Sequence, residues 1–248
     1  MARLSLVPLL LAALAAVSGA SAAVFPQPRD VAVPGTLETT DGIDGIDGID
    51  GTEATAAASY TSSYWNDGTA TVKYTNGPNG QYSVTWSGDK GNFVAGKGWN
   101  GAPPAAVNYS GTFEPKGNAY LSMYGWTTNP LVEYYIVESY GTHKPCSSPS
   151  DEATQKGNVT VDGSTYEIWT KIRRNKPSIQ GTATFPQFFS IRTDRRVGGT
   201  VHTDAHFKAF AAGGLKMGTQ KYMIVATEGQ DSSGTASIDV GVAPAAAA

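Results

Sequence analysis

The sequence predicts an all-β fold, in which a β-sandwich carries a single α-helix. Thr, Val and Tyr alternate with other residues through several short runs, which is typical of half-buried strands. Turn-forming sequences separate these runs, notably residues 76–80 (NGPNG) and the pair Asp162-Gly163. One segment has helical spacing instead. Many strands with a single helix indicate a β-sandwich.

The first 22 residues predict a secretion signal. Arg3 supplies the positive end, an apolar stretch runs from Leu4 to Val17, and small residues at 20–22 form a cleavage site. The apolar stretch is too short and alanine-rich for a membrane span, and no later segment competes with it. We therefore expect a secreted, extracellular protein that is free of membrane.

Residues 23–58 predict an acidic propeptide or a disordered linker. Aromatic residues nearly vanish here, and a three-residue unit repeats from Asp41 to Gly51. Such a segment buries too little apolar surface to offset its ordering entropy. Its period of three matches neither an EF-hand loop nor a nine-residue calcium repeat, so we prefer a linker to a metal site.

The net charge also differs on the two sides of residue 58. Residues 1–58 hold seven acidic residues against Arg3 and Arg29, a net charge of −5, whereas the whole chain carries −3. Residues 59–248 therefore carry +2, which gives no argument for nucleic acid or for strongly anionic partners. The uncharged backbone of a polysaccharide fits this part at least as well.

Residues 59–241 predict one domain, and residues 242–248 predict a flexible tail. A length of about 180 residues suits one hydrophobic core and is short for two. A helix is expected from about residue 203, where Thr203 or Asp204 can cap it, Phe207 and Phe210 recur at helical spacing, and glycines at 213–214 end it. The periodic strand runs are Thr69–Tyr74, Gln81–Trp86, Tyr120–Trp126, Tyr166–Arg173 and Thr182–Asp194.

Neither cysteine nor histidine suggests a reactive or metal centre. Cys146 is the lone cysteine, so it is either a spare thiol or forms an intermolecular bond. His143 is expected in a loop, His202 before the helix and His206 within it, with core or capping roles. We therefore expect no metal and no cofactor.

Two strand-like stretches each carry a glutamate among aromatic residues. In residues 129–138 (NPLVEYYIVE), alternation places Glu133 and Tyr135 on one face, and in residues 222–229 (YMIVATEG) it does the same for Tyr222 and Glu228. From the first stretch alone, Glu133 would be interpreted as a solvated glutamate on a half-exposed strand. Two such strands instead suggest a paired-carboxylate site, which glycoside hydrolysis requires.

Nine motifs lie in consistent order between about Ser59 and about Val240. They are SYWNDG, NGPNGQYSVTWS, GKGWN, YLSMYGW, PLVEYYIVE, KPSIQGTATF, HFKAF, YMIVATEG and SSGTAS. Together they closely resemble glycoside hydrolase family 11, the small endo-β-1,4-xylanases. The resemblance implies a β-jelly roll, a sandwich of two twisted antiparallel sheets around a cleft with one α-helix. It also implies a secreted monomer that hydrolyses internal β-1,4-xylosidic bonds of xylan with retention of configuration.

The resemblance assigns the chemistry to the two glutamates. Glu133 matches the family's nucleophile and Glu228 its general acid/base, and in retaining enzymes two such carboxyls lie about 5–5.5 Å apart. The roles need unequal pKa values, because Glu133 must be ionised while Glu228 keeps its proton until it donates. Glu138 has the opposite strand parity to Glu133, and we take it as structural.

Four aromatic positions are implied to bind the sugar. Trp65 matches the family's stacking tryptophan on the glycone side, Tyr124 and Tyr135 match the tyrosines beside the nucleophile, and Tyr222 matches one near the acid/base strand. Sugar faces are apolar and stack on such rings. Without the resemblance, each of these residues would be interpreted as core.

Residues 176–181 (KPSIQG) match the family's thumb, a hairpin tip that closes over substrate. Pro177 stiffens this tip and Gly181 permits a turn. Arg173 and Gln187, on the two flanking runs, match positions that hydrogen-bond the bound sugar. Alone, Arg173 would be interpreted as an exposed cation at a sheet edge.

Two asparagines are also singled out. Asn108 matches a family position beside the acid/base, where its amide is expected to tune the pH dependence by hydrogen-bonding Glu228. Asn108 and Asn158 both begin glycosylation sequons. A glycan at Asn108 would fill the cleft, so we expect glycosylation at Asn158, in a polar loop, instead.

Two other functions are compatible with a β-sandwich of this kind. A family 12 type endoglucanase uses two glutamates on a similar jelly roll, and the motif set disfavours it. A non-catalytic carbohydrate-binding sandwich needs only an aromatic platform, which gives no reason for a glutamate on each of two strands. Residues 230–231 (QD) and 187–189 (QFF) depart from the commonest family forms and leave fine substrate preference open.

Overall fold

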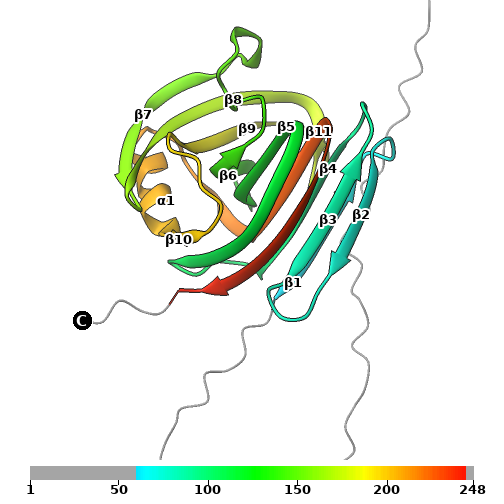
Figure 1. Cartoon of the computed structure of the whole chain (residues 1–248). Coiled ribbons are helices and arrows are strands. Elements are labelled where there is room, and N and C mark those ends of the chain that lie inside the picture. Colours follow the sequence, from blue (N-terminus) through cyan, green and yellow to red (C-terminus); the bar gives the residue numbers. More distant parts are fainter. Residues whose placement is uncertain (1–59, 244–248) are drawn as a thin grey trace, which may run out of the picture.

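The computed structural model describes residues 60–243, and these fold into eleven strands, one α-helix and one short 3₁₀ helix (Figure 1). The predicted signal peptide (1–22), the predicted propeptide (23–58) and residues 244–248 lie outside the described residues. The last strand runs to Val242, so the folded part extends one residue beyond the predicted boundary at residue 241.

The five periodic runs found in the sequence all overlap observed strands, although several strands are longer or were not predicted. The elements follow one another as β1 (Thr61–Asn66), β2 (Thr71–Asn76), β3 (Tyr82–Ser87), β4 (Asn92–Asn100), β5 (Val107–Thr128), β6 (Val132–Tyr140), η1 (Pro149–Asp151), β7 (Thr154–Val161), β8 (Ser164–Ser178), β9 (Gly181–Arg192), β10 (Gly199–Val201), α1 (Thr203–Ala212) and β11 (Thr219–Val242).

Strands β5 and β11 are long enough to take part in two layers. The N-terminal half of β11 lies between β4 and the C-terminal half of β5, which forms an inner layer in the order β1-β4-β11-β5-β6-β9-β8-β7. The C-terminal half of β11 lies between β3 and the N-terminal half of β5, in an outer layer that adds β2 and β10. A register shift between Gln230 and Ser233 separates the two halves of β11.

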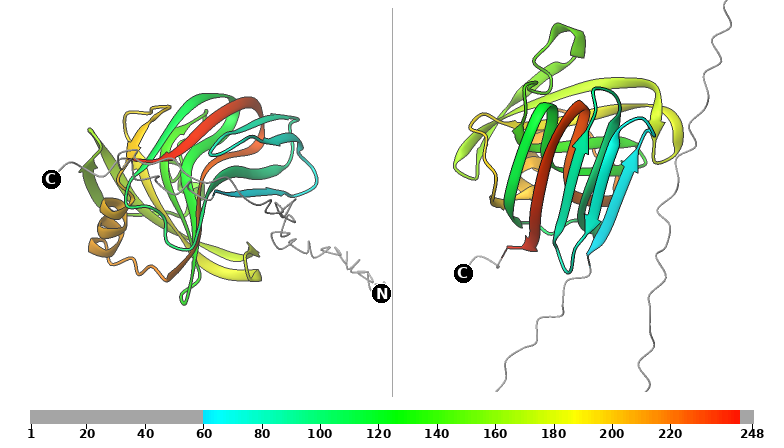
Figure 2. Two further views of the ribbon diagram at one scale, coloured as in Figure 1. Left: turned by 90° about the horizontal axis from the view of Figure 1, so that it is seen from below. Right: turned by 45° about the vertical axis from the view of Figure 1, so that its right-hand side comes forward.

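This arrangement confirms the predicted all-β jelly-roll sandwich with one helix, with two differences. The two layers are parts of one continuous sheet that folds over itself, as Figure 2 shows from two further directions. Pairing between the described strands is antiparallel except between β6 and β9, which run parallel. The long connection through η1, β7 and β8 makes this parallel pairing possible, since neighbouring parallel strands need a crossover.

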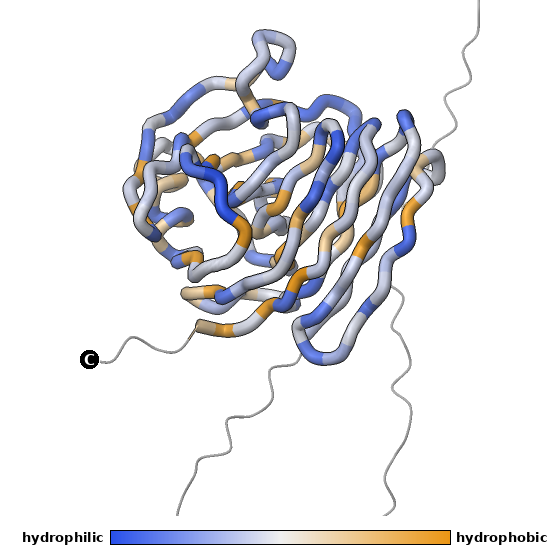
Figure 3. Tube along the Cα trace, viewed as in Figure 1, coloured by the Kyte–Doolittle hydropathy of each residue, from blue (hydrophilic) through white to orange (hydrophobic). Residues whose placement is uncertain are grey.

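The main core lies on the face of the inner layer that is turned toward the outer layer and α1. Val132, Tyr134 and Ile136 of β6 point into it, as the alternation of the sequence predicts, and Phe210 of α1 joins them. The opposite face of the inner layer is also apolar, with a second cluster described below. Along the strands, apolar residues alternate with polar ones in Figure 3.

The helix forms where it is predicted, but its predicted cap is wrong. His202 occupies the N-cap position, and no side chain caps the helix there. The buried Thr203 hydroxyl donates instead to the carbonyl oxygens of Pro104, at 2.6 Å, and Ala105, at 3.2 Å. These acceptors come from a distant loop, so tertiary packing decides the use of this hydroxyl.

Cys146 and His206 are both buried, as structural roles require. The Cys146 thiol is unpaired among the described residues, and burial raises its pKa to about 12. Of the two alternatives left by the sequence, the structure therefore favours a spare thiol over an intermolecular bond. His206 lies within α1, and its Nδ1 is 2.8 Å from the Ser190 hydroxyl.

Glu138 is fully buried and holds three segments of the chain together. Its Oε2 accepts from the Arg196 guanidinium at 2.5 Å and from the Tyr109 hydroxyl at 3.1 Å, and its Oε1 accepts from the Tyr166 hydroxyl at 2.5 Å. The carboxylate thus links β6 to β5, β8 and the loop before β10. This confirms the expectation that Glu138 is structural.

We predict that Glu138→Gln destabilises the fold by about 3 kcal/mol, because Arg196 loses its buried counter-charge. For a domain of this size the melting temperature should fall by about 6–12 °C. Thermal unfolding followed by circular dichroism measures the change. Activity per folded molecule should persist below the transition, and its loss in a variant of normal stability would contradict a structural role.

Candidate functional site

Glu133 lies on β6, on the face opposite the main core. Its strand neighbours in register are Trp126 of β5 and Gln187 of β9. The carboxylate is buried and receives three hydrogen bonds. Oε1 accepts from the Tyr124 hydroxyl at 2.8 Å and from the Tyr135 hydroxyl at 3.2 Å, and Oε2 accepts from Gln187 Nε2 at 2.6 Å.

These donors counteract the effect of burial on the pKa of Glu133. Burial raises the pKa of this carboxyl above its usual value, and hydrogen bonds from Gln187 and Tyr124 and the charge of Arg173 limit this rise. Three donors pointing at two oxygens suit an ionised acceptor and leave little room for a proton. The geometry therefore holds Glu133 as a carboxylate.

Trp126 orients this network and was not predicted as a site residue. Its indole Nε1 donates to the Tyr124 hydroxyl at 2.7 Å, so the tyrosine proton is directed at Glu133. Trp126 also contacts Phe185 of β9, with ring centroids 4.9 Å apart. A signal existed in the sequence, because Tyr124 and Trp126 share a strand face.

Glu228 lies on β11 and pairs with Val94 of β4 and Tyr120 of β5. Its Oε2 is buried and has no hydrogen-bond partner among the described residues. The residue after it must be glycine, because a Cβ on Gly229 would lie 2.5 Å from a ring carbon of Phe93. The close packing of β11 at this point fixes the backbone that carries Glu228.

The environment of Glu228 favours its protonated form. Burial and then the charge of Glu133 raise the pKa of Glu228 to about 7, against smaller opposing effects of Tyr135, Lys171 and Arg173. Glu133 has three hydrogen-bond donors, whereas an oxygen of Glu228 has none, and this difference separates the two carboxyls. One is arranged to stay ionised, and the other keeps its proton up to about pH 7.

An apolar cluster surrounds both carboxyls, and we call the sheet face that bears it the concave face. The Tyr135 ring lies 5.0 Å from that of Tyr124, which lies 6.2 Å from that of Tyr222. Trp65, in register with Val94, packs against the margin of the cluster. The buried members are Val94, Tyr124, Trp126, Tyr135, Val137, Cys146, Phe185, Phe189, Ile191, Ile224 and Ala226.

The predicted thumb is the turn between β8 and β9. Arg173 of β8 pairs with Phe185 and so faces the concave side. Pro177 is exposed near the tip and pairs with Thr182, while Ile179 packs against the concave-face cluster. Of the predicted site residues, the structure brings eight together on this face, namely Trp65, Tyr124, Glu133, Tyr135, Arg173, Gln187, Tyr222 and Glu228, with Pro177 at the tip beside them.

The prediction that Asn108 lies beside the acid/base is wrong. Asn108 is the second residue of β5, where it pairs with Gly241 and accepts a hydrogen bond from the Thr200 hydroxyl. It is twelve residues along β5 from Tyr120, the strand partner of Glu228. A strand advances about 3.3 Å per residue, so this separation excludes contact with Glu228.

The asparagine next to Glu228 is Asn92, which the sequence analysis did not select. Asn92 pairs with Gln230, and Val94, two residues on, pairs with Glu228. Asn92 and Glu228 are therefore diagonal neighbours on one sheet face. Asn92 Oδ1 is buried and, like Glu228 Oε2, lacks a hydrogen-bond partner among the described residues.

Asn158 lies in strand β7, not in a loop as predicted, but its side chain is exposed and accepts from Gln155 at 3.1 Å. A glycan at Asn108 would not fill the cleft, because Asn108 is remote from Glu228. Its side chain is instead half-buried against Thr200. Glycosylation at Asn158 stays a prediction.

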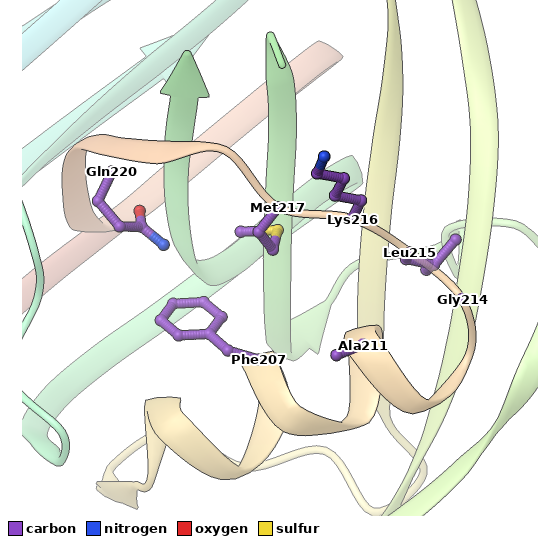
Figure 4. Close-up of a pocket in the computed structure, with 7 residues that line it drawn as sticks. All are labelled: Phe207, Ala211, Gly214, Leu215, Lys216, Met217 and Gln220. Atoms are coloured by element: carbon purple, nitrogen blue, oxygen red, sulfur yellow. The ribbon is translucent and has the colours of Figure 1, made fainter. Parts of the chain in front are cut away.

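No other feature of residues 60–243 competes with the concave face as a reaction centre. They contain no group of three His, Cys, Asp or Glu residues placed to bind a metal, and no helix long and apolar enough to cross a membrane. A groove of about 550 Å³ lies beside α1 (Figure 4), but no carboxylate lines it. Its lining is Phe207, Ala211, Gly214, Leu215, Lys216, Met217 and Gln220.

Comparisons with known proteins agree on one family. The family described as glycosyl hydrolases family 11 matches residues 57–239. Endo-1,4-beta-xylanase 11A of Botryotinia fuckeliana (strain B05.10) is 54% identical over 185 residues, which cover 74% of this chain and 80% of the relative. Probable endo-1,4-beta-xylanase B of Aspergillus clavatus is 56% identical over 181 residues, covering 73% and 80%.

A solved structure supports the same grouping. It is one of two major endo-1,4-beta-xylanases from Trichoderma reesei, 43% identical in sequence, with a TM-score of 0.67 over 73% of this chain and 97% of that one. The family match covers almost the whole described region, including both glutamates of the concave face. The chain therefore belongs to glycoside hydrolase family 11.

Proposed function

We propose that this protein is an endo-β-1,4-xylanase, which hydrolyses internal bonds of xylan with retention of the anomeric configuration. The observation that carries the proposal is the pair of glutamates on one aromatic face, one saturated with hydrogen-bond donors and the other protonated by its surroundings. The substrate class comes from relatives named as endo-1,4-beta-xylanases.

Glu133 is the nucleophile in this mechanism. Its carboxylate attacks the anomeric carbon while Glu228 protonates the leaving oxygen, which gives a covalent glycosyl-enzyme. Water then attacks this intermediate, and Glu228 takes the proton from the water. The hydrogen bonds from Tyr124 and Gln187 keep Glu133 ionised and oriented between turnovers.

The change of role at Glu228 follows from its dependence on Glu133. The negative charge of Glu133 contributes to the raised pKa of Glu228. That charge is absent while Glu133 is esterified to the sugar, so the pKa of Glu228 then falls. Glu228 consequently serves as an acid in the first step and as a base in the second.

The remaining residues of the concave face hold the sugar chain. Trp65 and Tyr222, at the margins of the cluster, offer ring faces to the apolar faces of xylose units. Arg173 supplies hydrogen-bond donors beside Glu133, and Pro177 stiffens the thumb tip that closes on the substrate. We further propose that the protein is secreted and works as a monomer.

The two alternatives fit the site less well. A carbohydrate-binding sandwich has no use for the three donors that converge on Glu133 or for a protonated Glu228. A family 12 type endoglucanase would act on glucan, whereas the relatives are named as xylanases. Reducing sugar released from xylan and from carboxymethylcellulose separates the two enzymes directly.

We predict that Glu133→Gln and Glu228→Gln each abolish most xylan hydrolysis. The loss for Glu228→Gln should be about 10²- to 10⁴-fold in kcat, which is the usual contribution of a general acid, and at least as large for Glu133→Gln. Release of reducing sugar from xylan is the measurement. Glu114→Gln, an exposed substitution on the outer layer, serves as the control and should retain activity.

The same assay with the unsubstituted protein tests the stereochemistry. Proton NMR of the first product from a xylo-oligosaccharide should show the β anomer before mutarotation, because two inversions at the anomeric carbon restore its configuration. An initial α anomer would mean that water attacks directly, and Glu133 would then be a base and not the nucleophile.

We predict that the pH profile of the protein is bounded by the two coupled carboxyls. Activity should fall as pH rises through the pKa of Glu228, about 7, because the proton donor is lost, and as pH falls through the pKa of Glu133. In Glu133→Gln the pKa of Glu228 should drop, since the neighbouring charge is removed. Carbon-13 NMR of labelled glutamate carboxyls measures it, and an unchanged value would rule out the proposed coupling.

We predict that Asn92→Asp, and not Asn108→Asp, shifts the pH optimum. A second carboxyl beside Glu228 shares one proton with it, and a carboxyl pair loses its first proton at lower pH than one buried acid. The acid limb of the kcat/KM profile should therefore move toward acid in Asn92→Asp, because the singly protonated pair, which donates the proton, forms at lower pH. Asn108→Asp is the matched control, and an equal shift in both variants would refute the assignment to Asn92.

A further inference from the structure

Lys171 places a positive charge near Glu133 but is not among the residues that hydrogen-bond Glu133. It lies on β8 in register with Gln187, whose amide donates to Glu133, and so faces the concave side. Its ammonium lies 5.2 Å from the centroid of the Phe189 ring. That ring stacks on Tyr135 with centroids 4.8 Å apart and planes 7° from parallel. One aromatic pair therefore separates this cation from the nucleophile.

The charge of Lys171 is incompletely neutralised. Its ammonium donates no hydrogen bond within residues 60–243, and its nearest carboxylate oxygen, Asp151 Oδ1, lies 3.9 Å away. The other oxygen of Asp151 accepts from the Ser148 backbone amide at 3.0 Å and lies 3.4 Å from His143 Nε2. Asp151 is thus engaged in the loop around η1 and holds Lys171 nearby without binding it closely.

Two neighbouring cations, unlike Lys171, have their charges engaged by specific partners. Lys144 donates to both carboxylate oxygens of Glu167 at 2.8 Å, so its charge is balanced within the loop and strand it joins. Arg173, two residues from Lys171 on the same strand face, acts on Glu133. Lys171 therefore has hydrogen-bonding capacity that no residue among 60–243 uses.

The Lys171 side chain is already confined. Only 17% of it is exposed, and its ammonium lies over the Phe189 ring, so part of its rotational freedom is lost before any ligand arrives. A preorganised, partly desolvated ammonium binds an anion more strongly than a flexible surface lysine. The neutral main chain of xylan offers hydroxyls for this purpose, but no charge.

We propose that Lys171 binds a carboxylate carried by the polysaccharide, so that the enzyme prefers xylan substituted with a uronic acid. The inference rests on the proposed xylanase function and names the substrate subclass. The aromatic face binds the neutral chain, and Lys171 adds one charge-assisted hydrogen bond when a uronic acid substituent reaches the side of the site formed by β8. Lys171 also acts electrostatically on Glu228, but that effect is the same for every substrate.

The test compares two substrates that differ only in the charge of the substituent. One is glucuronate-substituted xylan, and the other is the same polymer after chemical reduction of its carboxyl groups. We measure kcat/KM on both for the full protein and for Lys171→Met, Lys171→Arg and Lys144→Met, each at its own pH optimum and at low and high salt. Circular dichroism melting checks that each variant is folded.

The protein should prefer the charged polymer by about tenfold or more, which is the usual effect of one hydrogen bond to a charged group. The preference should disappear in Lys171→Met and at high salt, and should persist in Lys171→Arg and Lys144→Met. Equal ratios in the protein and in Lys171→Met, or an altered pH profile with an unchanged ratio, would overturn the proposal. Failure on both polymers would instead contradict the xylanase function itself.

Discussion

The pairing of β5 with β11 along nearly their whole length is the constraint on which the rest of the structure depends. Each strand crosses from the inner to the outer layer, so the sheet has to fold over itself. The fold leaves one face of the inner layer against the core and bends the other into the concave face. Glu228 lies on β11 itself, and Glu133 lies on β6, the next strand beyond β5. The curvature that closes the sandwich therefore also gathers the two carboxyls.

Within this frame, hydrogen bonding makes two identical side chains chemically different. Both glutamates are desolvated, which alone would raise the pKa of each. The Glu133 carboxylate accepts hydrogen bonds from two tyrosine hydroxyls and an amide, and the Trp126 indole holds one of these hydroxyls in place. Glu228 has an unsatisfied buried oxygen and a charged neighbour. The division between nucleophile and proton donor thus resides in the surrounding donors.

Charges elsewhere in the molecule serve distinct purposes that their positions reveal. Glu138 is as buried as Glu133 and only five residues away, but it is surrounded by Arg196, Tyr109 and Tyr166 and links strands. Lys144 closes an ion pair with Glu167, whereas Lys171 remains available beside the ring of Phe189. Neither the type of a charged residue nor its burial assigns its role, which depends on how completely its partners satisfy it.

The sequence by itself determined the fold class, the helix and the strand faces that carry Glu133 and Glu228, because alternation and turn chemistry are local. It missed β4, where Gly96 replaces the expected bulky residue because a Cβ there would lie 2.1 Å from the Val225 carbonyl oxygen. It also selected Asn108 in place of Asn92. Only the tertiary structure decided which asparagine neighbours Glu228, because that depends on the register between β4 and β11, strands that lie more than a hundred residues apart in the chain and carry no local record of their pairing.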